Sequence, residues 1–257
     1  MDEIENCTLP QILSRQAQTL GDNAVAIREK AYGIWQRYTW NDYYNHVKYT
    51  CLGMISLGLR RNDNVGIIMD NHPEWLFSEI GAQAAGAVSL NLFTSAITSE
   101  LVGALSRIHA SFVIAQDQEQ VDKLIEKKED LPHLIRIIYV DPTGMRTYQD
   151  NPWLLSFAEL LEAGRTFEAA SPGLFESEIE KGKPDETAVM ILTSGTTGIA
   201  KLAMLTHRNF TSMARKWLAT EPIGIGSNWM SMSPPAWIVD QMWGVGVTLA
   251  GGMVMNF

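Results

Sequence analysis

Residues 65–69 read Val-Gly-Ile-Ile-Met, a short apolar run that is typical of a buried strand. Pro73 stands where the first turn of a helix would begin, and residues 74–85 continue that helix until Gly86 breaks it. A second apolar run, 87–92, predicts the next strand. The alternation continues with expected helices at 100–108 and 117–128 and expected strands at 111–115 and 134–140. This βαβαβαβ order predicts a parallel sheet with helices on both faces.

The segments around this core have weaker or shorter patterns. Helical periodicity is expected at 8–17 and 40–57, with two strands between them at 24–28 and 36–39. Between 141 and 185, prolines and glycines recur, which predicts an irregular connection between two sheets. We expect one helix within it, at 156–163.

The composition is that of a globular chain and excludes some classes of function. The 257 residues are 46% hydrophobic and 19% charged, with a net charge of −9. An acidic protein gains no counterion-release energy from phosphate backbones, so we expect no nucleic-acid binding. The two cysteines, Cys7 and Cys51, and the five histidines lack metal-ligand spacing, so no metal ligand is predicted.

The sequence also contains no recognisable targeting signal. Residues 1–5 are acidic and lack the basic start and apolar stretch of a signal peptide. No run reaches the ~18–20 apolar residues that a spanning helix needs. With so few cysteines, these features favour a cytoplasmic location.

One loop carries the pattern of a phosphate-binding site. Residues 193–201 read Thr-Ser-Gly-Thr-Thr-Gly-Ile-Ala-Lys, after an expected strand at 187–192 and before an expected helix at about 208–219. Glycines let the backbone approach a polyphosphate closely, hydroxyl and backbone N–H groups donate hydrogen bonds, and Lys201 adds a positive charge. The dipole of the following helix would strengthen such an anion site.

Two alternatives bear on this loop. A Walker loop needs a hydroxyl residue directly after its lysine, whereas Leu202 follows Lys201, so that motif is excluded. Composition alone also fits a plain Ser/Thr/Gly turn that only links a strand to a helix.

The longer string 193–209 resembles the signature of the AMP-forming, or adenylate-forming, synthetases: acyl-CoA synthetases, luciferases and peptide-synthetase adenylation domains. Ala200 and Leu202 depart from that signature, where proline and glycine are usual. Four further stretches, 33–40, 70–75, 117–124 and 137–144, resemble the long-chain fatty acid–CoA ligases.

This resemblance implies an α/β fold of two doubly wound sheet lobes with helices on both faces. Residues 1–257 would form an incomplete N-terminal AMP-binding domain. The first lobe would span about 65–185, and about 1–64 plus 186–257 would form part of the second.

The resemblance also implies a reaction: fatty acid, ATP and CoA give acyl-CoA, AMP and pyrophosphate through an acyl-adenylate. Lys201 is the implied catalytic residue. Residues 233–237, Ser-Pro-Pro-Ala-Trp, resemble the segment that lines the acyl and adenylate pocket, which assigns Trp237 to that pocket. His207 is assigned to packing at the base of the loop. The implied contacts to the ATP phosphates come from Thr193, Ser194, Gly195, Thr196, Thr197, Gly198 and Lys201.

Later motifs of such enzymes are absent from these residues, including those that contact AMP and Mg²⁺ and most of those that determine CoA specificity. We therefore expect that this chain alone has no synthetase activity. A fatty acyl-AMP ligase and a non-catalytic truncated homologue remain alternatives. A homodimer of the full-length enzyme and a peripheral membrane contact are also left open.

Overall fold

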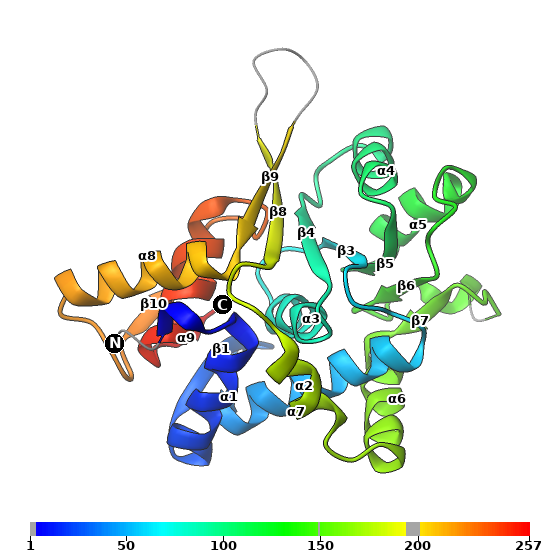
Figure 1. Cartoon of the computed structure of the whole chain (residues 1–257). Helices are drawn as coiled ribbons and strands as arrows, with labels where there is room; N and C mark the ends of the chain where they lie inside the picture. The colour runs from blue at the N-terminus through cyan, green and yellow to red at the C-terminus, as the bar shows by residue number, and fades with distance from the viewer. Residues whose placement is uncertain (1–3, 149, 194–200) are drawn as a thin grey trace.

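The computed structural model describes residues 4–148, 150–193 and 201–257, which form two sheets surrounded by helices (Figure 1). The strands of the larger sheet are parallel except for the last, which runs antiparallel to its neighbour. The predicted parallel sheet is thus confirmed. The strand order is β7 (Leu154–Ser156), β6 (Arg136–Tyr139), β5 (Ala110–Ala115), β3 (Asn64–Ile68), β4 (Val88–Leu92), β8 (Thr187–Thr193) and β9 (Lys201–Thr206).

Helices cover both faces of this sheet, as predicted. The described α-helices are α1 (Leu9–Leu20), α2 (Trp40–Ser56), α3 (Pro73–Ala84), α4 (Thr98–Arg107), α5 (Gln118–Glu126), α6 (Phe157–Ala170), α7 (Leu174–Lys181), α8 (His207–Thr220) and α9 (Thr248–Gly251). Along β3, Val65 and Ile67 join the core that includes α2 and α3, whereas Ile68 joins the core beneath α4 and α5. Alternate residues of a strand point to opposite faces, so both faces of the sheet are buried.

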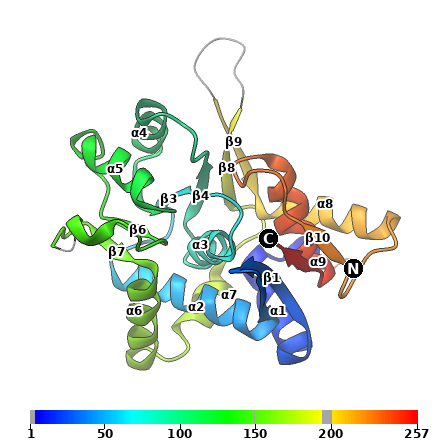
Figure 2. The same ribbon diagram turned by 180° about the vertical axis from the view of Figure 1, so that it is seen from behind.

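The smaller sheet has four strands, in the order β10 (Asn228–Met230), β11 (Val254–Asn256), β1 (Val25–Ala31) and β2 (Ile34–Thr39). β10, β11 and β1 are parallel, and β2 is antiparallel to β1. Ile27 and Met255 of this sheet belong to the same hydrophobic core as Val65 of the larger one. From behind, α3 is again seen near the centre of the molecule (Figure 2).

Short helical turns complete the fold. The described 3₁₀ turns are Ile4–Asn6, Gly21–Asn23, Lys128–Asp130 and Met145–Tyr148. Between β10 and α9 the chain forms a π-helix, Asp240–Val247, here called η5. In the described part of the chain, no helix has both the length and the apolar character needed to cross a membrane.

Helix starts follow local sequence signals. The side chain of Asp117 accepts a hydrogen bond from the backbone N–H of Gln120 (3.2 Å), which confirms the predicted cap of α5. Pro73 occupies the first turn of α3, also as predicted. Reciprocal capping boxes begin α1, α2, α6 and α8.

The connection expected to be irregular, 141–185, is more ordered than predicted. α6 extends to Ala170 instead of 163, and α7 follows it after a turn that contains Pro172 and Gly173. Gly173 has φ +79°, a left-handed conformation that suits glycine at the N-cap of α7. Pro172 and Gly173 therefore separate two helices, where the sequence was read as a continuing loop.

The strands divide differently from the lobes expected at 65–185 and at 1–64 plus 186–257. β8 and β9 lie within 186–257 but extend the larger sheet, because β8 pairs with β4 through Ser89–Val189 and Leu90–Met190. Within the described residues, β10 and β11 are the strands of 186–257 that join β1 and β2.

Candidate functional site

The predicted phosphate-binding loop connects the two strands of a hairpin. β8 ends at Thr193 and β9 begins at Lys201, and the Thr193 hydroxyl donates a hydrogen bond to the Lys201 carbonyl oxygen (3.2 Å). Both residues are exposed, on a hairpin that projects from the sheet (Figure 1). Outside the described residues lie the other members of the predicted loop, Ser194, Gly195, Thr196, Thr197 and Gly198.

A strand that the sequence did not predict lies between Lys201 and the following helix, which bears on the expected contribution of a helix dipole. β9 was not expected, and its residues 202–206 lie between Lys201, where the loop ends, and α8. Thr206, which caps α8, pairs with Thr187 at the base of the hairpin, and the His207 N–H donates to the Glu186 carbonyl (3.2 Å). The effect of a helix dipole fades within about one turn, and β9 separates Lys201 from the start of α8, so no dipole contribution is expected at Lys201.

A large cavity opens beside the hairpin. Its volume is about 980 Å³, within the range of small-molecule sites. One wall comes from β8 and β9 and includes Ile191, Thr193 and Ala203; another comes from α4 and includes Leu101. The segment that leads into η5 supplies a further wall with Trp237. Thr193 and Trp237, both predicted site residues, thus line the same cavity, whereas Lys201 is not among the lining residues.

Trp237 is held loosely by the rest of the protein. Its side chain is 53% exposed, and its ring meets that of Phe93 edge to face at 6.5 Å between centroids. Its neighbours Ile238 and Val239 also line the cavity and are 43% and 40% exposed. Large apolar side chains left this accessible in a cavity are available to an apolar ligand.

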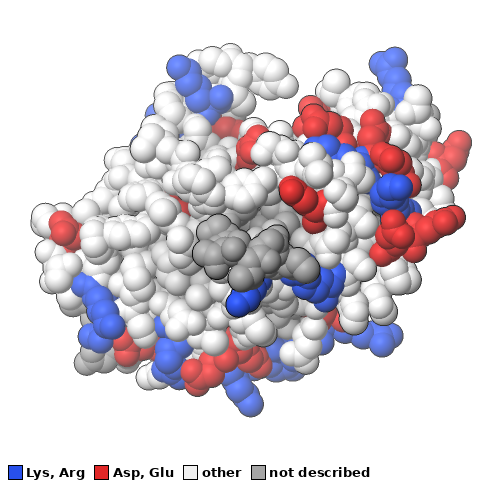
Figure 3. Space-filling model, turned by 90° about the horizontal axis from the view of Figure 1, so that it is seen from above, with Lys and Arg blue, Asp and Glu red and all other residues white. Residues whose placement is uncertain are grey.

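The cavity lining is mainly apolar. Its described charged members are Glu100 and Arg107, both on α4. Seen from above, the surrounding surface has few charges over much of its area and gathers acidic side chains toward the side of α4 and α5 (Figure 3). The lining therefore suits the apolar part of a ligand.

A buried polar cluster fixes one end of the segment that carries Trp237. Asn71 Nδ2 lies within hydrogen-bond distance of three acceptors, the Ser231 hydroxyl, the Ser233 carbonyl oxygen (2.8 Å) and Asp240 Oδ2 (2.8 Å), which share its two hydrogens. Asp240 also accepts from the Ser231 hydroxyl and from Trp229 Nε1 (3.3 Å). Burial raises the pKa of Asp240, while these hydrogen bonds act to lower it. Sequence reasoning missed this cluster, because its members lie up to 169 positions apart.

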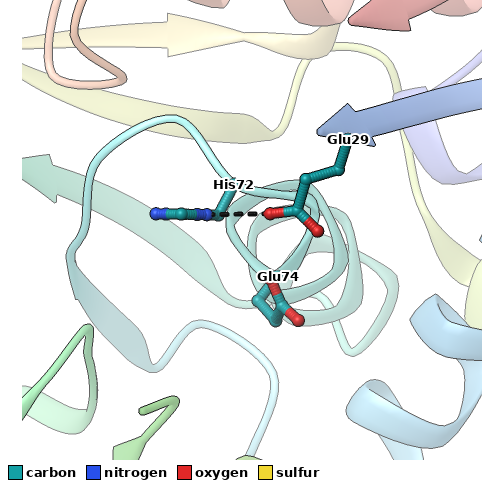
Figure 4. A group of neighbouring side chains, drawn as sticks. All are labelled: Glu29, His72 and Glu74. Carbon is teal, nitrogen blue, oxygen red and sulfur yellow. Dashed lines mark hydrogen bonds and ion pairs between the residues drawn. The ribbon is translucent and has the colours of Figure 1, made fainter. Parts of the chain in front are cut away.

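A second group of ionisable side chains lies away from the cavity residues. His72 Nδ1 is 3.0 Å from Glu29 Oε1, with Glu74 beside them (Figure 4). Burial, together with the charge of Glu29, raises the pKa of Glu74. Ligand atoms of all three residues lie within 4.8 Å of one another, the described grouping that comes nearest to a metal site. The hydrogen-bond contact between His72 Nδ1 and Glu29 Oε1 already accounts for the closeness of these two residues.

Residues 13–257 match the family of AMP-binding enzymes, and the chain belongs to that family.

Among curated proteins, the chain is similar to the long-chain-fatty-acid–CoA ligase ACSBG2 of Xenopus laevis, with 29% identity over 79% of this chain and 27% of that protein. It is also similar to the long-chain-fatty-acid–CoA ligase heimdall of Drosophila melanogaster, with 27% identity over 97% of this chain and 37% of that protein. The chain therefore spans 27% and 37% of the lengths of these two relatives.

Solved structures share the fold. The anthranilate CoA ligase AuaEII in complex with anthranoyl-AMP superposes with a TM-score of 0.82 at 18% identity, over 98% of this chain and 45% of that one. A Mycobacterium tuberculosis fatty acyl CoA synthetase superposes with a TM-score of 0.77 at 18% identity, over 100% of this chain and 45% of that one. The predicted fold class is confirmed.

Proposed function

We propose that this chain is part of a long-chain fatty acid–CoA ligase that uses ATP and CoA and releases AMP and pyrophosphate. The observation that carries the proposal is the apolar cavity of about 980 Å³ beside the hairpin of the signature loop. Burying a fatty acyl chain removes apolar surface from water, at roughly 0.8 kcal/mol per methylene. Thr193 at the wall of the cavity fits a carboxylate end that meets the ATP phosphates near the loop.

In the proposed reaction, the fatty carboxylate attacks the α-phosphorus of ATP, forming the acyl-adenylate and releasing pyrophosphate. The thiol of CoA then attacks the acyl carbonyl and releases AMP. Lys201, exposed at the start of β9, would stabilise negative charge on the leaving pyrophosphate. Thr193 would donate a hydrogen bond to a phosphate oxygen.

Mg²⁺ belongs to the proposal as a partner of the ATP polyphosphate. Mg²⁺ prefers six oxygen ligands and keeps several waters. Among the described cavity-lining residues, Glu100 is the one carboxylate, so the described wall by itself does not form a Mg²⁺ site and no step is assigned to the ion.

The test is ATP–pyrophosphate exchange, measured on the complete polypeptide that the gene encodes. Exchange should depend on added long-chain fatty acid and should fall about 10²-fold or more in Lys201→Ala, the order seen when a group that stabilises transition-state charge is removed. Lys127→Ala is the matched control, because Lys127 is exposed beyond the end of α5. Undiminished exchange in Lys201→Ala would remove the role given to that lysine.

A second measurement separates the ligase from a fatty acyl-AMP ligase. With CoA present, a CoA ligase accumulates acyl-CoA, whereas an adenylate-only enzyme accumulates acyl-AMP. The cytoplasmic location, the homodimer and the peripheral membrane contact stay predictions.

A further inference from the structure

A buried carboxylate lies behind the wall of the cavity. Glu79 of α3 is fully buried, with 0% of its surface exposed. Burial raises its pKa, and the hydrogen bonds that it accepts act to lower it. Four N–H groups donate to its oxygens: Trp75 Nε1 (2.8 Å), Asn91 Nδ2 (2.8 Å), Gln241 Nε2 (3.0 Å) and Gln83 Nε2 (3.4 Å).

The three amides around Glu79 have one orientation in common. Each turns its NH₂ group to the carboxylate, and within the described residues its own oxygen has no hydrogen-bond partner. The oxygens of the Glu79 carboxyl accept these hydrogen bonds, and an amide offers a donor only through its NH₂ group, so the carboxyl sets this orientation. Glu79 therefore fixes which group of each amide faces inward, including that of Gln241 in η5.

Gln241 connects Glu79 to the wall of the cavity. Its Nε2 group carries two hydrogens, and it donates to Glu79 (3.0 Å) and to the Pro235 carbonyl oxygen (2.8 Å). The residues directly after Pro235, numbers 236–239, all line the cavity. Gln83 also donates to Glu79, but no hydrogen bond joins it to this segment.

Hydrophobic packing alone leaves this wall weakly fixed. The side chains of Trp237, Ile238 and Val239 are 40–53% exposed, so little core contact holds them in place. By contrast, Asp240 and Gln241 directly after them are fully buried. Polar contacts at 240 and 241 therefore position the exposed residues before them, where the chain enters a π-helix, an element frequent at functional sites.

We propose that Glu79 is a positioning residue, which acts through Gln241 and Pro235 to set the shape of the cavity wall at 236–239 and so the acyl chain that the cavity accepts. This inference rests on the proposed function for the identity of the ligand. The clamp itself consists of three groups, the Glu79 carboxylate, the Gln241 amide and the Pro235 carbonyl, and is independent of that identity.

A matched pair of variants tests the clamp on the 257-residue chain. Gln241→Met and Gln83→Met each remove one buried amide donor from Glu79 with little change of volume, but Gln241 alone of the two contacts Pro235. Amide hydrogen exchange at 236–239 should become about tenfold faster in Gln241→Met, the order expected for the loss of one buried hydrogen bond. In Gln83→Met, exchange there should stay within about twofold of the parent. Equal acceleration in both variants would overturn the proposal.

Ligand binding supplies the second readout, with a fluorescent long-chain fatty acid, cis-parinaric acid, as the probe. Its dissociation constant should rise about tenfold in Gln241→Met and stay near the parental value in Gln83→Met. If the parent binds no probe while the exchange pattern holds, the ligand assignment fails and the clamp stands. If the parent binds and both variants bind equally well, the positioning role fails.

Replacement of Glu79 itself gives a rescue experiment. Glu79→Met removes both acceptor oxygens and should reproduce the fast exchange of Gln241→Met. Glu79→Gln keeps an acceptor at the Oε2 position for Gln241, while its new NH₂ takes the place of Oε1 and can face the unpaired oxygen of Gln83 once that amide turns. Glu79→Gln should therefore return exchange at 236–239 to within about twofold of the parent; exchange as fast as in Glu79→Met would contradict the relay.

Discussion

The imidazole Nδ1 of His207 accepts a hydrogen bond from the backbone N–H of Leu9 (3.2 Å), joining the first residue of α8 to the first residue of α1. The N–H groups of a first helical turn lack partners within their own helix, so His207 satisfies one of them. His207 is 3% exposed, and burial lowers its pKa to about 3. It is therefore neutral at physiological pH and serves packing, as the sequence assigned it.

The burial of His207 predicts an acid-sensitive contact. Because the folded-state pKa lies below the ordinary value of 6.5, the stabilisation is fully present above pH 6.5 and is lost as the pH falls toward about 3. At about 1.4 kcal/mol per pH unit, the loss is on the order of 5 kcal/mol. His207→Asn keeps an acceptor near Nδ1 without titrating in this range, so its unfolding free energy should depend less on pH between 6.5 and 4. The unfolding free energies of the parent and of His207→Asn are measured by urea denaturation at each pH. An equal dependence on pH in the two proteins would contradict this prediction.

Close packing between α2 and α6 predicts a glycine requirement. A Cβ on Gly164 would overlap the Tyr49 carbonyl oxygen, which is backbone and cannot turn aside. Gly164→Ala should therefore lower the unfolding free energy by about 1–3 kcal/mol or more. Gly103→Ala is the control, because a Cβ there meets nothing within 4 Å and alanine favours the helix by roughly 0.5–1 kcal/mol. The two variants should shift the denaturation midpoint in opposite directions.

The volume of the cavity predicts a change in chain-length preference. Ala203 on β9 lines the cavity, and Ala203→Leu would place three more carbons inside it. Each methylene of the ligand that can no longer be buried costs about 0.8 kcal/mol, or roughly fourfold in affinity. We therefore expect the dissociation constants of Ala203→Leu, measured for fatty acids of increasing length, to exceed those of the parent for the longest fatty acids first. Ala219→Leu, at an exposed position of α8, should leave the series unchanged.

The exposure of Trp237 predicts that its loss weakens binding more than stability. Trp237→Ala removes a ring that is 53% exposed, so the unfolding free energy should change by about 0.5 kcal/mol or less. Affinity for the fatty-acid probe should fall, because the ring lines the cavity. The control is Trp35→Ala, which removes another exposed tryptophan (45%) on β2. It should change neither the unfolding free energy nor the affinity for the fatty-acid probe. A large loss of stability in Trp237→Ala would assign that ring to the core.

Much of the fold was predictable because its signals are local. The run 65–69, Pro73 and the Asp117 cap each act within a few residues, and each prediction is confirmed. β9 was missed although short apolar runs flank the glycine-containing loop, a pattern that also indicates a hairpin. α7 was missed because Pro172 and Gly173 are also typical of a continuing loop.

The sequence by itself determined the alternation of strands and helices between 65 and 140, the family signature at 193–209 and the candidates Thr193, Lys201 and Trp237. The tertiary structure decided that Thr193 and Trp237 line one cavity and that Lys201 lies outside its lining. It also decided that Gln241 meets Glu79 across 162 positions of the chain. The physical reason is that periodicity and capping record interactions between near neighbours, whereas contacts between distant residues depend on the order in which the strands pair.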